Sequence, residues 1–215
     1  MSWAFDPESA DETGLVGVGA DLEPGTLLAA YAAGCFPTRF EPYNDERLPM
    51  FWWSPDPRAI IELDGLHISR RLNRTIRSGI FTTTINRNFA GVMRGCADRD
   101  DGTWITRDFL EAYQRMHQLG HAQSVEVWQD GQLVGGTYGV AIAGLFAAES
   151  MFHRVSDASK VALAALIDRL NERGFQLLDI QILSDHTASM GAVEIPRAEY
   201  LERLGSALKT VCRFH

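Results

Sequence analysis

The sequence is poor in cysteine and has no long apolar run, and each absence excludes a class of protein. Its three cysteines, Cys35, Cys96 and Cys212, include no C-x-x-C pair, so neither a disulfide framework nor a structural zinc site is predicted. No apolar stretch approaches the roughly 20 residues that span a bilayer, and residues 1–20 carry acidic side chains where a secretory signal would carry Lys or Arg. We therefore expect reduced thiols, a cytoplasmic location, and neither a membrane nor a metal site.

The chain also lacks net positive charge, since its formal charge is -8 over 215 residues. This balance argues against a general nucleic-acid binder, because non-specific affinity depends on neutralising phosphates. One local basic segment stands out between Ser69 and Gly79, which are suited to begin and end a helix. Helical spacing puts three arginines on one face, Arg70, Arg74 and Arg77. This face either contacts phosphates or is merely solvated.

The chain contains no repeats or low-complexity tracts, and its periodicity predicts an α+β protein. Residues 1–20 have no periodicity, a helix is expected from Pro24 to Gly34, and the proline-rich residues 36–57 are predicted to form a folded loop. A lobe boundary near residues 62–68 divides the chain into a small N-terminal lobe, 1–65, and a larger domain, 66–215.

The larger domain is predicted to alternate helices and strands. Expected helices cover residues 88–94 and 107–119, and a third helix begins at a Ser156 cap and ends at Gly174. Asp130-Gly131 predicts a hairpin between strands around residues 125–128 and 133–134. Further strands are expected at 141–152 and 175–183.

Asp179 and Gln181 place polar groups with strand periodicity inside an apolar run. Because side chains alternate along a strand, both should share one face, while Leu178, Ile180 and Ile182 take the other. A carboxylate and a carboxamide on one face can bind, orient or deprotonate an amine. The alternative is an edge strand with a solvated face.

Glu149 interrupts another apolar run, where a charge is costly unless it has a partner. That partner is either a structural cation, Arg154 or Lys160, or the positive end of a ligand. Trp104 lies in a loop entering a helix, where an indole can stack on a base. Three apolar residues are candidates to line a pocket, although each alone is typical of core: Phe146, Met151 and Leu163.

Five segments, taken together and in this order, carry a resemblance to a known family. They are Tyr31-Ala-Ala-Gly-Cys-Phe-Pro, Trp52-Trp-Ser-Pro-Asp-Pro-Arg, Gly102-Thr-Trp-Ile-Thr-Arg, Leu145-Phe-Ala-Ala-Glu-Ser-Met-Phe, and Asp179-Ile-Gln-Ile-Leu-Ser-Asp-His-Thr-Ala-Ser-Met-Gly-Ala. Between about Gly19 and Leu204, the chain resembles the bacterial leucyl/phenylalanyl-tRNA-protein transferases. The resemblance implies a GNAT-like acyltransferase domain and transfer of Leu or Phe from aminoacyl-tRNA to proteins that begin with Arg or Lys, which marks them for degradation.

The resemblance also assigns roles to residues. It implies that Asp179 and Gln181 are the catalytic pair and that Glu149 lies in the active site. Trp104 is the first candidate for the adenine platform, Tyr31 the second, and Trp53 could approach the ligand. The basic helix coincides with the family's basic cluster, which favours acceptor-stem phosphates as its partners. No cofactor is implied, and we expect a monomer.

Two positions depart from the family pattern. Thr38 follows Gly-x-Phe-Pro where an aromatic residue is expected, and Thr137 stands where Met is usual. The first puts part of the adenine platform in question, with Phe40 as a substitute ring, and the second alters the expected shape of the amino-acid pocket.

Two other functions remain open at this stage. An acetyl-CoA-dependent N-acetyltransferase would share the fold, since fold does not fix function. However, Arg154-Val-Ser-Asp-Ala-Ser has Asp157 where a glycine would let backbone amides approach pyrophosphate. A non-catalytic tRNA- or degron-binding module would leave Asp179, Gln181 and Glu149 unexplained.

Overall fold

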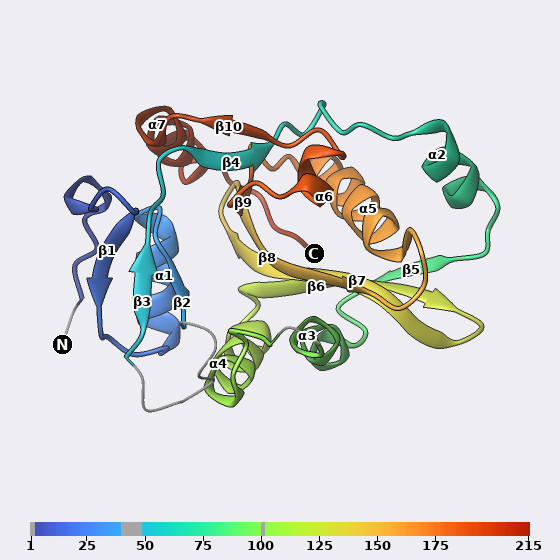
Figure 1. The fold of residues 1–215 in the computed structure, drawn as a ribbon, viewed down its shortest axis with the longest axis horizontal. Helices are drawn as coiled ribbons and strands as arrows, with labels where there is room; N and C mark the ends of the chain where they lie inside the picture. The colour runs from blue at the N-terminus through green and yellow to red at the C-terminus, as the bar shows by residue number, and fades with distance from the viewer. Residues whose placement is uncertain (1–2, 40–48, 100–101) are drawn as a thin grey trace.

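The computed structural model describes residues 3–39, 49–99 and 102–215 and contains two β-sheets (Figure 1). A small antiparallel sheet with the order β1-β3-β2 forms the N-terminal lobe with a short 3₁₀ helix and one α-helix. Its elements are η1 (Pro7–Ser9), β1 (Leu15–Val18), α1 (Pro24–Ala32), β2 (Phe36–Thr38) and β3 (Phe51–Trp53). The 36–57 segment, expected to be a loop, therefore contributes two strands, which pair with each other.

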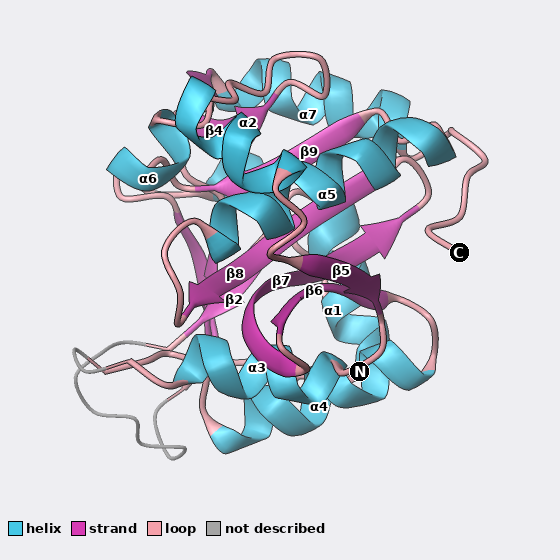
Figure 2. Ribbon diagram, turned by 90° about the vertical axis from the view of Figure 1, so that its right-hand side faces the viewer, coloured by secondary structure: helices cyan, strands magenta, loops and turns pink. Residues whose placement is uncertain are grey.

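The larger sheet has seven strands in the order β10-β4-β9-β8-β7-β6-β5. Its strands are β4 (Arg58–Ile61), β5 (Thr82–Ile85), β6 (Ala122–Gln129), β7 (Gln132–Ile142), β8 (Leu145–His153), β9 (Leu177–Gln181) and β10 (Val193–Ile195). Helices α3 and α4 cover one face, and α5 covers the other (Figures 1 and 2). The helices are α2 (Arg70–Arg77), α3 (Phe89–Ala97), α4 (Arg107–Gln118), α5 (Ala158–Arg173), α6 (Asp185–Ala188) and α7 (Arg197–Ala207). The predicted α+β class with a small N-terminal lobe is confirmed.

Local sequence signals explain several element boundaries. The Asn88 side chain accepts a hydrogen bond from the Gly91 amide at 3.0 Å and caps α3. Gly174 ends α5 with a φ of 76°, a left-handed conformation that glycine adopts without strain. Asp130 and Gly131 both have positive φ, which confirms the hairpin predicted between β6 and β7.

Two predicted boundaries are wrong. Residues 141–142 belong to β7 rather than to the following strand, because the chain turns at Ala143, whose φ is 50°. Gly144 is the single turn signal at this point, and an isolated glycine inside an apolar run is a weak one. The cap of α5 is Asp157, with a φ of 70°, one residue beyond the predicted Ser156.

The boundary between residues 65 and 66 stays a prediction. The strand immediately before it, β4, pairs with β9 and β10 in the larger sheet. The small lobe is thereby joined to the centre of the molecule through residues 58–61.

The two strands that matter most for function are β8 and β9, the parallel pair of the large sheet. They pair only from Leu145 with Leu177 to Ala147 with Asp179, while β8 continues to His153. A β-bulge lies in β8 at the same level, because the consecutive residues Tyr138 and Gly139 of β7 pair with Ser150 and Ala148 and leave Glu149 as the extra residue. Gly139 is required there, since a Cβ would collide with the Ala147 carbonyl. The sheet therefore opens beyond Ala147.

Within the described ranges, no helix combines the length and apolar character needed to cross a lipid bilayer.

Candidate active site

A cleft of about 420 Å³ lies where β8 and β9 separate. Residues of the small lobe form one wall and residues of the large sheet form the rest. The lining residues are Phe36, Pro37, Thr38, Arg99, Trp104, Thr137, Ala148, Glu149, Ser150, Met151, Ile180, Gln181, Ile182, Leu183, Ser184 and Thr187. The site therefore joins both lobes and contains the predicted residues Glu149, Gln181, Trp104 and Met151.

Glu149 and Gln181 form the polar floor of this cleft. The Gln181 amide nitrogen donates to Glu149 Oε1 at 2.8 Å, and the Tyr113 hydroxyl donates to Oε2 at 3.2 Å. Burial raises the pKa of the Glu149 carboxyl to about 7, and the nearby Asp179 adds to this effect. Hydrogen bonds from Tyr31, Tyr113 and Gln181 act in the opposite direction. Glu149 can therefore exchange a proton near neutral pH.

The structural partners considered for Glu149 are engaged elsewhere. Arg154 lies 3.7 Å from the Asp98 carboxylate, and the Lys160 amine is 3.4 Å from the Ser189 hydroxyl. In residues 3–39, 49–99 and 102–215, no ion pair of Glu149 is present. The carboxylate is thus held by neutral donors and faces the cleft without a resident cation.

Tyr31 and Tyr113 extend the hydrogen-bonded chain behind Glu149. Their hydroxyls are in direct contact with each other, and both rings are buried. Burial, followed by the Glu149 charge, raises the pKa of both phenols well above the ordinary value, so both stay protonated at neutral pH. Tyr31 is therefore placed behind the floor of the cleft and not on the wall where a base would stack.

Asp179 lies in a completely buried ion pair. Its carboxylate accepts from Arg58 Nε at 2.9 Å, Arg58 Nη2 at 2.6 Å, and the Tyr200 hydroxyl at 2.9 Å. It also accepts from the Gln181 backbone amide at 2.9 Å. Because Asp179 is 0% exposed, the direct contact with an acceptor amine expected from strand alternation is at odds with this geometry.

Strand alternation also fails beyond Ile180. Gln181 has a φ of 64°, a left-handed conformation that costs a residue other than glycine about 1 to 3 kcal/mol. The following residue, Ile182, is consequently 65% exposed at the mouth of the cleft instead of facing the core with Leu178. Such strain persists where surrounding contacts impose it, and here the Asp179 carboxylate holds the Gln181 amide.

Comparison with known proteins decides the family. The sequence profile described as "Leucyl/phenylalanyl-tRNA protein transferase" matches residues 60–205, and the profile of the N-terminal domain of the same enzymes matches residues 20–56. The chain belongs to the leucyl/phenylalanyl-tRNA protein transferase family. This confirms the resemblance found in the sequence.

Individual relatives of the family agree over nearly the whole chain. The leucyl/phenylalanyl-tRNA--protein transferase of Citrobacter koseri is 52% identical over 93% of this chain and 85% of its own length. That of Solidesulfovibrio magneticus is 50% identical over 94% of this chain and 81% of its own length. Among solved structures, a GCN5-related N-acetyltransferase from Kribbella flavida is 14% identical, covers 80% of this chain and 60% of that one, and gives a TM-score of 0.40.

The aromatic residues predicted for the adenine platform lie at different depths. Trp104 is partly exposed in the cleft wall and is braced edge-on by Phe109 at 5.1 Å between ring centroids. The Trp53 indole nitrogen donates to the Thr38 hydroxyl at 2.8 Å, and Thr38 itself lines the cleft. Trp53 therefore holds Thr38 at the wall of the cleft. Phe40 lies outside the described residues.

The predicted apolar pocket is only partly assembled. Met151 and Thr137 line the cleft, and the Thr137 hydroxyl donates to the Ser150 carbonyl at 3.0 Å. Phe146 instead packs with Phe214 at 5.4 Å between ring centroids, and Leu163 is fully buried in the same cluster beneath α5. Neither residue is among those that line the cleft.

The three predicted arginines lie on α2, which contacts α5 and lies at the end of the molecule opposite β1 and β3 (Figure 1), and none of them lines the cleft. Arg70, Arg74 and Arg77 line a shallow depression together with Asn73 and Ser78. Leu72 is buried on the opposite side of this helix, and Ile76 is 38% exposed.

Three residues of the site were not singled out by the sequence: Arg58, Tyr113 and Tyr200. Arg58 heads the apolar strand β4, and a charge there requires a buried partner in the same way as Glu149 does. The two tyrosines occur at ordinary core positions of α4 and α7. Only their buried hydroxyls distinguish them.

Proposed function

We propose that this chain transfers Leu or Phe from charged tRNA to the N-terminal Arg or Lys of acceptor proteins and so creates a degradation signal. The observation that carries the proposal is the Glu149 carboxylate, which faces a cleft of about 420 Å³ without a resident cation. A protonated N-terminal residue would supply that missing charge. The relatives at about 50% identity are named for the same reaction, and an acetyl-CoA-dependent activity is not favoured.

The proposed reaction is aminolysis of an ester. The acceptor α-amine forms a bond to the aminoacyl carbonyl carbon, the bond from that carbon to the ribose oxygen breaks, and the ribose hydroxyl takes up a proton. An α-amine has a pKa of about 7.7 to 8.0, so only a modest base is needed to complete its deprotonation. Glu149, with a pKa of about 7, is matched to receive the amine proton near neutral pH.

In the proposed reaction, Gln181 binds the acceptor amine and Asp179 positions Gln181. Because Gln181 uses its amide nitrogen to donate to Glu149, its amide oxygen is available to accept from the acceptor amine. Asp179 acts as a positioning residue, since its carboxylate binds the Gln181 backbone amide and the Arg58 guanidinium. Correct placement of reacting groups accounts for a large share of catalysis in such reactions.

Trp104 is proposed to stack on the terminal adenine, and the α2 arginines to contact acceptor-stem phosphates. An indole in the cleft wall supplies a sequence-tolerant stacking surface, and the arginines supply phosphate neutralisation that a net charge of -8 does not. We take the working unit to be a monomer in the cytoplasm, where aminoacyl-tRNA is available.

A direct transfer assay tests the proposal. The protein is incubated with labelled Phe-tRNA and a peptide that begins with Arg, and the product is identified as the peptide extended by Phe. An otherwise identical peptide with an acetylated N-terminus is the matched control, since it lacks the nucleophile. Extension of the free peptide alone is expected. No extension with charged tRNA, or acetylation of the peptide from acetyl-CoA instead, would overturn the assignment.

A further inference from the structure

A second cleft, of about 560 Å³, adjoins the first and shares four residues with it: Arg99, Met151, Ser184 and Thr187. It lies between the carboxyl end of α3, the amino end of α5, and α6. These elements come from distant parts of the sequence and converge beside the open end of β8 (Figure 2). None of the roles described above uses this cleft.

The polar lining of the second cleft is suited to an anion. Arg99, Arg154, His153 and His186 line it together with hydroxyl groups, and among the described residues the one carboxylate in the lining is Asp98, which is 78% exposed. The Nε2 atom of His186 is buried and has no hydrogen-bond partner among the described residues. Burial lowers the pKa of His186, and the neighbouring Lys160 and His153 add to this effect. The cleft therefore places the cationic side chains of Arg99 and Arg154 in the same lining as His186, whose Nε2 atom has no hydrogen-bond partner among the described residues.

The second cleft also connects the reaction site with the basic helix. At the amino end of α5, the Ser156 hydroxyl lies 3.3 Å from Arg71 Nη2, and the Asp157 carboxylate lies 3.4 Å from Arg71 Nε. The Asp157 charge is thus directed to α2 and is not part of the cleft lining. A nucleic-acid strand that leaves the first cleft in this direction would pass the second cleft and then reach α2.

We propose that the second cleft binds the backbone phosphates immediately 5′ of the terminal adenosine of the charged tRNA. Arg154 supplies a guanidinium, His186 supplies its unpartnered ring nitrogen, and Arg99 lies where the two clefts meet. This inference rests on the proposed function, because it assigns a further part of the same donor. An acceptor peptide that begins with Arg or Lys is disfavoured here, since its charge would meet cations.

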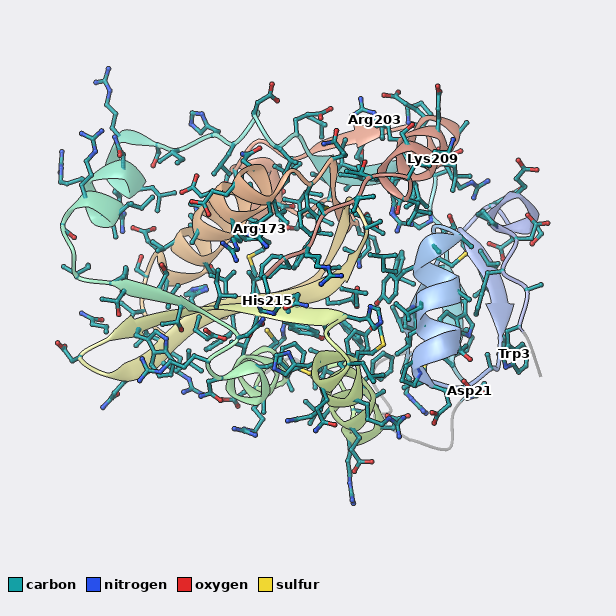
Figure 3. All side chains as sticks on the ribbon, turned by 180° about the vertical axis from the view of Figure 1, so that it is seen from behind. Trp3, Asp21, Arg173, Arg203, Lys209 and His215 are labelled. Carbon is teal, nitrogen blue, oxygen red and sulfur yellow. The ribbon has the colours of Figure 1, made fainter. Side chains whose placement is uncertain are left out.

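Three donors of increasing length test the assignment: phenylalanyl-adenosine, which has no internucleotide phosphate, the trinucleotide CCA carrying Phe, and Phe-tRNA. The variants are Arg154→Gln and His186→Gln. Arg173→Gln is the matched control, because it removes the same charge at the opposite end of α5, beside the C-terminal residues (Figure 3). The triple variant Arg70→Ala, Arg74→Ala, Arg77→Ala separates the stem contacts from those of the cleft.

For Arg154→Gln and His186→Gln, kcat/KM should fall about tenfold with the trinucleotide and with Phe-tRNA, and stay unchanged with phenylalanyl-adenosine. Arg154→Gln should also reduce the slope of log affinity against log salt by about 0.7 for the single-stranded donor, because it removes a cation. His186→Gln should leave that slope unchanged, because the lowered pKa of His186 favours the neutral imidazole. The triple α2 variant should affect Phe-tRNA alone. Asp98→Asn should act in the opposite direction and tighten the trinucleotide, because it removes the carboxylate beside Arg154.

Several results would overturn the inference while leaving the proposed function intact. Equal losses with phenylalanyl-adenosine would mean that these residues shape the reaction cleft, and unchanged trinucleotide kinetics would mean that the cleft binds no phosphate. A higher KM for the acceptor peptide at saturating donor would assign the cleft to the acceptor. Failure of the unaltered protein to transfer Phe from any donor would instead overturn the proposed function itself.

Discussion

Removing the Arg58 guanidinium should destabilise the protein more than an ordinary core substitution. Arg58 and Asp179 are each about 1% exposed and form two hydrogen bonds with each other. In Arg58→Met, the Asp179 carboxylate would keep only the Tyr200 hydroxyl and the Gln181 amide as donors. Burial alone would lower the pKa of the Arg58 guanidinium, but Asp179 and Tyr200 raise it.

The expected magnitude follows from the cost of leaving one buried charge unpaired, about 3 to 5 kcal/mol. For a chain of 215 residues, each kcal/mol lowers Tm by about 2 to 4 °C, so Tm should fall by roughly 6 to 20 °C. Arg58→Met also removes the hydrogen bond from Nη1 to the Gly34 carbonyl, 3.0 Å long, which joins the large sheet to the small lobe. We therefore expect the decrease in Tm to lie in the upper half of this temperature range.

A double-mutant cycle measures the pair directly. Free energies of unfolding are obtained by urea titration for the unaltered protein, Arg58→Met, Asp179→Asn, and the double variant. The double variant should be less destabilised than the sum of the two single variants, by roughly 2 kcal/mol, because it leaves no unpaired charge. Strict additivity would refute the reasoning. Below the unfolding transition, Arg58→Met should lower kcat for transfer and retain binding of charged tRNA, since the Asp179 carboxylate that positions Gln181 loses the guanidinium that holds it in place.

Three further outcomes concern the cleft. With saturating donor, the transfer rate should rise with pH as Glu149 loses its proton around its pKa of about 7. Glu149→Gln should lower kcat by roughly a hundredfold or more and leave only the rise that follows the acceptor amine, with its pKa of about 7.7 to 8.0; an unchanged profile for this variant would remove Glu149 as the base. Trp104→Ala should weaken binding of phenylalanyl-adenosine by about 1 to 3 kcal/mol, measured by titration, whereas equal affinity per folded molecule would assign Trp104 to structural support. Thr137→Met should fill part of the cleft that Thr137 lines and change the ratio of kcat/KM for Phe and Leu donors by about tenfold; a constant ratio would place residue 137 outside the amino-acid pocket.

The sequence alone was sufficient where a signal depends on a few neighbouring residues. The helix-ending Gly174 and the Asp130-Gly131 turn were recognised because backbone conformation at such positions is limited by local sterics. The family was recognisable for a related reason, since its motifs, such as Asp179-Ile-Gln, are short runs of consecutive residues that can be read directly from the sequence. The resemblance favoured placing Glu149 and Trp104 in one site, whereas Met151 was a pocket candidate only because its side chain is apolar.

The tertiary structure decided what local patterns leave open. Arg58 and Asp179 are 121 residues apart, so no local pattern links them, and only the pairing of β4 with β9 brings their charges together. The same pairing imposes the left-handed backbone at Gln181 and thereby turns Ile182 to the mouth of the cleft. Phe146 and Leu163 illustrate the converse, because an apolar side chain carries no mark of whether it lines a pocket or fills the core. Local sterics fixed the helix ends and turns of this protein, whereas the partner of each buried charge was fixed by long-range strand pairing, since in a low-dielectric interior a charge is stable only where the fold supplies its counterpart.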